Sequence, residues 1–198
     1  MSWTFFGDRP RLGRSNSYDQ CMVAPRRSMT GRFVHLEWDR SHESFDAIVV
    51  AQGISGMIAR QVHDYVPLEG YKWIRSDEIV DIEFLDHDHP AVRLARLRGV
   101  PVDRPGRGMS DLAVLLRAMR RQRKLIFVQQ ERTGSDEGLI GYVPSLDRTH
   151  ATLDDVDPQG RCPGELLSIR RDQIISVEWG TPYLAALNDL VQADGPVR

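Results

Sequence analysis

The sequence predicts a mainly β protein with short helices, built as two tandem five-stranded small β-barrels that arose by internal duplication. The first observation behind this prediction is a repeated stretch. Residues 74–84 read IRSDEIVDIEF and residues 169–179 read IRRDQIISVEW, at an offset of 95 positions. The second is the spacing of short β-branched and aromatic runs, which recur about every ten residues between Gly and Pro, as in small barrels and sandwiches.

The repeat divides the chain into four segments. We expect an N-terminal arm at 1–31, a first barrel module with a trailing helix at 32–98, a linker at 99–109, and a second module at 110–198 with a leading basic helix and a C-terminal helix. The strands expected in the first module are 33–38, 45–51, 54–62, 71–75 and 79–84, and those in the second are 125–129, 138–143, 149–153, 166–170 and 174–179. Closing each set into a barrel would remove its exposed edges.

Three helices are expected outside the strands. Pro90 and Pro182 each suit the first position of a helix, and each follows the last strand of its module. Between the modules, Ser110 is placed to cap a helix over 111–124, whose apolar stripe is Leu112, Leu115, Leu116 and Met119.

Within the repeated stretch, a polar turn joins two strands. Asp77 and Asp172 are placed to bond the backbone amides of that turn, and Arg75 and Arg170 are placed to form ion pairs with them. We interpret the turn as fixing strand register; the alternative is that the two arginines contact a ligand.

Charge is unevenly distributed along the 198 residues, although the net charge is only −2. Residues 1–32 carry +4, 33–90 carry −8, 91–124 carry +8 and 125–198 carry −6. The basic segments are expected to dock on the acidic modules, within one chain or between subunits. The alternative is that the basic arm and the basic helix bind nucleic acid.

Membrane, metal and disulfide roles are not predicted from the remaining composition. No apolar run approaches the roughly 18 residues of a membrane-spanning helix, and the arginine-containing start is not ordered like a secretion signal. Cys21 and Cys162 lie far apart without neighbours at metal-ligand spacing, so we expect reduced thiols in a cytoplasmic protein with no cofactor.

The candidate chemistry is sparse. His87 and His89 would point the same way on a strand, which permits a two-histidine metal site completed by a carboxylate elsewhere; the alternative is a solvated polar turn. The sequence contains no nucleophile, zinc-protease or phosphate-binding signature, so we expect no enzyme activity. A basic face on the expected helix could contact nucleic acid; it consists of Arg117, Arg120, Arg121 and Lys124. No aromatic side chains interleave with this face for base stacking.

Residues 110–179, a helix followed by five strands, resemble the Sm-like fold. SH3-like barrels also end in a similar strand–turn–strand sequence. The second Sm motif, aliphatic-Arg-Gly-Asp-x-aliphatic, resembles residues 74–79 and 169–174, and the first resembles residues 138–142 together with 147–153. The asparagine that holds a base in RNA-binding members has no counterpart, since His150 and Ile58 stand near that place.

These observations rank three hypotheses. The first is a non-catalytic scaffold or protein-binding module that associates with a protein partner or with itself. The second, implied by the resemblance, is an RNA-binding Sm-like protein using Arg75, Arg170 and the basic helix. The third is an enzyme or metal protein centred on His87 and His89.

Overall fold

The computed structural model describes residues 28–38, 44–62, 70–99, 108–131 and 138–194. We call residues 28–99 the first half and 108–194 the second half. The first half contains β1 (Phe33–Trp38), β2 (Ser44–Gln52), β3 (Gly56–Gln61), β4 (Tyr71–Arg75), β5 (Ile79–Phe84) and α1 (Pro90–Leu97). The second half contains α2 (Leu112–Gln122), β6 (Ile126–Gln130), β7 (Leu139–Leu146), β8 (His150–Asp155), β9 (Leu166–Arg170), β10 (Ile174–Trp179) and α3 (Pro182–Asp194).

The chain is mainly β with short helices, and every expected strand is present within a few residues of its expected bounds. The N-terminal arm lies mostly outside the described residues, as does most of the linker. At 28–31 the described end of the arm joins the sheet, because Met29 is buried and the Gly31 N–H donates to the Val49 carbonyl at 2.7 Å.

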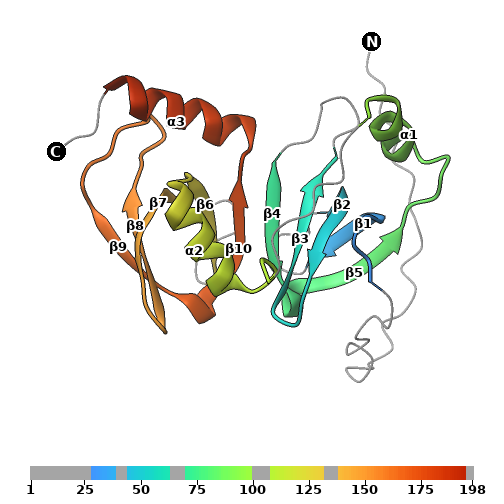
Figure 1. Ribbon diagram of the computed structural model, residues 1–198, viewed down its shortest axis with the longest axis horizontal. Coiled ribbons are helices and arrows are strands. Elements are labelled where there is room, and N and C mark those ends of the chain that lie inside the picture. The colour runs from blue at the N-terminus through green and yellow to red at the C-terminus, as the bar shows by residue number, and fades with distance from the viewer. Residues whose placement is uncertain (1–27, 39–43, 63–69, 100–107, 132–137, 195–198) are drawn as a thin grey trace, which may run out of the picture.

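The ten strands of the described residues form one antiparallel sheet in the order β5-β1-β2-β3-β4-β10-β6-β7-β8-β9. Within each half the last strand pairs with the first and the others follow as a meander. The halves join where β4 pairs with β10, side by side in the middle of the molecule (Figure 1). The sheet is therefore not closed: the expected closure of each five-stranded set is absent, because β4 and β10 pair with each other and not with β5 and β9.

The largest core cluster spans both halves. Helix α2 buries Leu115, Leu116 and Met119 against the second-half strands, as its apolar stripe predicts. The same cluster includes Ile58 and Trp73 from the first half. Burial of each such side chain contributes about 2 kcal/mol, so α2 holds the two halves to a common core.

The helix starts follow the sequence with one correction. The N-cap of α2 is Asp111, whose carboxylate accepts the Val114 N–H at 3.1 Å, and not Ser110. The Ser110 carbonyl instead accepts the indole N–H of Trp73 at 2.8 Å. For α3 the expected start is confirmed, because the Leu184 N–H donates to Thr181 Oγ1 at 3.2 Å. Among the described residues, no helix has the length and apolar character needed to cross a membrane.

Candidate functional site

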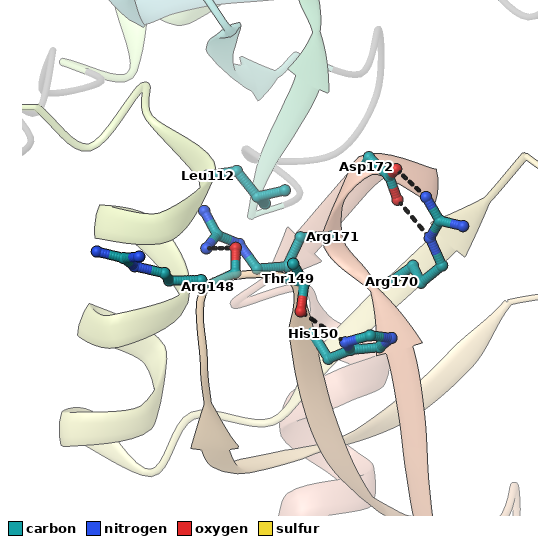
Figure 2. A pocket seen from close by; sticks show the side chains of 7 residues that line it. All are labelled: Leu112, Arg148, Thr149, His150, Arg170, Arg171 and Asp172. Carbon is teal, nitrogen blue, oxygen red and sulfur yellow. Dashed lines mark hydrogen bonds and ion pairs between the residues drawn. The ribbon is translucent and has the colours of Figure 1, made fainter.

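A hollow of about 630 Å³ lies at the end of the second half where β7 turns into β8 and β9 leads into β10. Its lining comes from the β7–β8 turn, the turn after β9 and the first residue of α2: Leu112, Arg148, Thr149, His150, Arg170, Arg171 and Asp172 (Figure 2). The lining contains three arginines and one histidine but only one aspartate, so its excess of basic side chains favours an anionic ligand.

The β7–β8 turn is held rigidly from two sides. The Asp147 carboxylate accepts the backbone N–H groups of Thr149 and His150, both at 2.7 Å, and these bonds hold the pKa of Asp147 below its usual value. From the other side, Arg171 Nη1 donates to the carbonyls of Asp147 at 3.1 Å and Arg148 at 2.8 Å. The turn therefore presents its side chains from a preformed backbone.

Arg170 lies beside the hollow and is paired with its neighbour. Its Nε and Nη2 donate to the Asp172 carboxylate at 3.1 and 2.5 Å, which lowers the pKa of Asp172. The predicted ion pair is thus present. Because 59% of the Arg170 side chain is exposed, the guanidinium could contact an incoming group as well as its own aspartate.

The corresponding place in the first half is filled. The backbones agree, since the Ser76 N–H donates to the Ser55 carbonyl as the Arg171 N–H donates to that of Thr149. Gly56, however, pairs with Arg75 where His150 pairs with Arg170. A Cβ on Gly56 would lie 2.4 Å from the Trp73 indole, so the tryptophan ring occupies this space in the first half.

Arg75 has a different environment from Arg170, although both end a strand before the same turn. Its guanidinium donates to Asp77 at 2.6 Å, to the Glu78 carboxylate at 2.6 Å and, across the junction, to Glu131 at 2.7 Å and the Asp172 carbonyl at 2.8 Å. Burial opposes its charge, but the hydrogen bonds with Glu131 and Asp77 outweigh that penalty and raise its pKa. Arg75 therefore ties the two halves together.

The predicted basic face exists on α2 but lies away from the hollow. Its four members are exposed: Arg117, Arg120, Arg121 and Lys124. They occupy the C-terminal half of the helix and its end, whereas the hollow touches only Leu112 at the first turn. Of the residues predicted for nucleic-acid binding, Arg170 alone lines the hollow.

The two histidines of the candidate metal site have different partners. His87 Nδ1 lies 2.8 Å from Arg96 Nη2, while His89 Nδ1 lies 3.6 Å from the Asp46 carboxylate. Asp46 itself bonds His35 Nδ1 at 2.7 Å. In the part of the chain that the structure describes, no group of three or more His, Cys, Asp and Glu side chains is arranged to hold a metal ion. The two-histidine site stays a prediction.

Sequence reasoning did not select most of the hollow's lining. Arg148, His150 and Arg171 became candidates only once the β7–β8 turn and the turn after β9 were seen side by side. The available signal was the Asp147 turn, since an aspartate two and three residues before Thr149 and His150 can bond both amides.

No protein-family model matches the chain, and no curated protein matches it either.

Proposed function

We propose that this chain is a non-catalytic scaffold of two tandem five-stranded small β-barrels, each left open between its fourth and fifth strands and similar in fold to Sm-like proteins, that works by associating with itself. The observation that carries the proposal is the position of exposed apolar side chains. Seven large apolar side chains are exposed among the described residues, and three of them lie on the two strands that end the sheet: Val80, Phe84 and Leu166. Edge strands with exposed apolar side chains are sites for pairing with another chain.

The strand order and the bulges support the barrel assignment. Each half repeats the arrangement in which its last strand pairs with its first and the remaining strands follow in order. Register shifts occur in β1 at Glu37/Trp38, in β2 at Val49/Ala51 and in β7 at Tyr142/Ser145. Bulges bend strands and increase their twist, which is how a five-stranded strip curls into a small barrel.

Sedimentation velocity over a range of concentrations tests self-association. We expect a mass above that of one chain at micromolar concentration, falling toward one chain on dilution. A single-chain mass at every concentration would contradict the proposal.

The second candidate function is RNA binding at the hollow. Its basic lining could contact phosphates, and the His150 ring, half-buried beside Thr149 Oγ1 at 2.9 Å, could stack on a base. This candidate follows the resemblance to Sm-like proteins and retains Arg170 from the predicted set.

Fluorescence anisotropy with single-stranded RNA and duplex DNA at low salt tests this second candidate. Arg148→Ala with Arg170→Ala is expected to weaken RNA binding by about tenfold. The matched control is Arg161→Ala, which removes an exposed arginine paired with Asp157 away from the hollow. Equal loss in both variants would indicate a general charge effect and would count against the hollow.

A further inference from the structure

Helix α3 has more apolar surface than the rest of the chain covers. Its Leu184, Leu187 and Val191 are buried against the second half. Residues three, four and seven apart share one side of a helix. A second set with this spacing is apolar and exposed, and we call it the outer stripe: Tyr183, Ala186, Leu190 and Ala193. Because a helix that is apolar on two sides is typically covered on both, the outer stripe is a candidate contact surface.

The outer stripe has a gap in its middle. Ala186 lies between Tyr183 and Leu190, which are 53% and 48% exposed. Two large side chains on either side of an alanine form the kind of hole that receives one side chain of a facing helix. Asp189 is exposed beside this gap, three residues after Ala186. Helix α3 contains no Lys or Arg, so the gap is bordered by negative charge alone on its own helix.

The loop between β8 and β9 adds carboxylates next to the outer stripe. A Cβ on Gly160 would lie 2.5 Å from the Leu190 Cβ, which places this loop against the stripe. At the two strand ends that enter the loop, the Asp155 N–H donates to the Glu165 carbonyl at 3.0 Å. Burial raises the pKa of Asp155, and the negative charge of Glu165 raises it further. These carboxylates favour a basic partner for the stripe.

Helix α1 presents the opposite combination. Arg93, Arg96 and Leu97 are exposed and share one side of the helix. The Leu97 side chain is 83% exposed. The other side of α1 is buried: Ala91, Val92 and Ala95. Helix α1 contains no Asp or Glu, so a single large apolar side chain protrudes from it between two cations.

The two helices lie at the same end of the molecule, away from the β7–β8 turn (Figure 1). They are equivalent, since each follows the last strand of its half. A two-fold rotation about an axis between them brings two copies together at this end, with α1 of each copy over α3 of the other. Leu97 then enters the gap over Ala186, and one of the two α1 arginines lies near Asp189. The contact is made twice in one pair, so it closes with two copies.

We infer that this end of the molecule is a docking surface for a second copy of the chain, with α1 of each copy packed on the outer stripe of the other. The inference rests on the proposed self-association and adds a surface separate from β5 and β9. Charge selects this arrangement over the pairing of like helices. Two α1 helices would bring arginines together, and two α3 helices would leave Asp189 without a cation.

Disulfide trapping tests the contact between Leu97 and the gap. Leu97→Cys and Ala186→Cys are made in separate chains, in a background with both native cysteines replaced by alanine, and the chains are mixed with oxidised glutathione. The matched control pairs Leu97→Cys with Ile54→Cys, a fully exposed position on the β2–β3 turn. We expect the first pair to cross-link about tenfold faster than the control pair.

Charge reversal tests the same contact without cysteines. Arg93→Glu with Arg96→Glu should raise the dissociation constant measured by sedimentation by about tenfold. Adding Asp189→Arg to that chain should recover most of the loss, because opposite charges again face each other. A folding defect would not recover in this way. Arg117→Glu with Arg120→Glu makes the same charge change on α2 and is the matched control; an equal loss there, or no recovery with Asp189→Arg, would exclude the contact.

The outcomes separate the inference from the proposed function. Equal cross-linking rates, with the wild-type chain still sedimenting as an oligomer, would overturn the α1–α3 contact and leave the scaffold function standing. A wild-type chain that sediments only as a monomer would overturn both.

Discussion

Arg75 and Arg170 end equivalent strands before the same kind of turn, yet their side chains differ in exposure and in hydrogen-bond partners. Only 18% of the Arg75 side chain is exposed, and it donates to three carboxylates and a carbonyl in both halves. Arg170 is 59% exposed and donates to one aspartate. The amino-acid sequences around the two arginines are almost the same. What differs is whether another strand lies beyond, and that is decided by the position of each turn in the sheet.

The comparison teaches that the repeated stretch encodes a turn and a strand edge, while its neighbours decide its role. At the junction the edge is occupied and the arginine is a structural tie. At the β9 end of the sheet no further strand pairs with this edge among the described residues, and Arg170 lines the hollow.

Arg75→Ala is expected to give the largest effect that separates the two turns. It removes the cation shared by the buried Glu78 and by Glu131, so the free energy of unfolding should fall by about 3 kcal/mol. Arg170→Ala, the matched control, should leave the free energy of unfolding nearly unchanged, because its pair with Asp172 is exposed to solvent. Denaturant unfolding measures both, and equal losses would mean that the two turns are equivalent after all.

The Lys72 substitution probes the charged part of the junction. Lys72 is buried, pairs with Glu178 and lies over the Trp38 ring at 3.9 Å, whereas β9 has Leu167 at the equivalent place. Lys72→Leu should cost about 2 kcal/mol, because Glu178 loses its cation at the junction. Replacing Glu178 by leucine as well should recover part of that loss. A double variant that is less stable than the single one would show that the ion pair is not what matters.

Gly56→Ala tests why the hollow is open in one half only. A Cβ at Gly56 would lie 2.4 Å from the Trp73 indole, so the ring must shift and its bond to the Ser110 carbonyl must lengthen. We expect a loss of about 1.5 kcal/mol and a change in tryptophan fluorescence. At the equivalent position, His150→Ala removes atoms from an open hollow and should leave stability nearly unchanged; a comparable loss there would contradict the comparison.

The smallest effect concerns stability in acid at the turn after β9. The Arg170 guanidinium lowers the pKa of Asp172 in the folded chain below its value in the unfolded chain. The resulting stability is present at pH values above the ordinary aspartate pKa of about 4. It is lost as the pH falls through the lowered value. Asp172→Asn should therefore reduce the slope of stability against pH only below about pH 4. Thermal melts of Asp172→Asn and of the control Asp189→Asn on α3 across that pH range measure the effect. If the two variants responded alike, the pair between Arg170 and Asp172 would not be its source.

Local elements could be predicted from the sequence because their signals are local. Strand alternation, Pro90 and Pro182 at helix starts, and the pairing of each arginine with the aspartate two residues on all depend on near neighbours. The cap of α2 lies one residue beyond the expected Ser110, because Ser110 and Asp111 are both good caps and the helix begins at Leu112, within reach of the Asp111 carboxylate.

The open sheet could not be predicted, because the β4·β10 pairing joins segments about a hundred residues apart and competes with closure of each half. The hollow depends on the same long-range arrangement. Arg148 and Arg171 have no shared motif in the chain, and they meet only because the β7–β8 turn and the turn that leads from β9 to β10 lie side by side.

The core beneath α2 has a consequence for how the chain unfolds. Leu115 and Leu116 pack in one cluster with Ile58 and Trp73 of the first half, so neither half can lose its packing without exposing apolar surface on the other. The repeat therefore does not make two independent folding units. Melting is expected as a single cooperative transition, and either half expressed alone would lack part of the interior that keeps it folded.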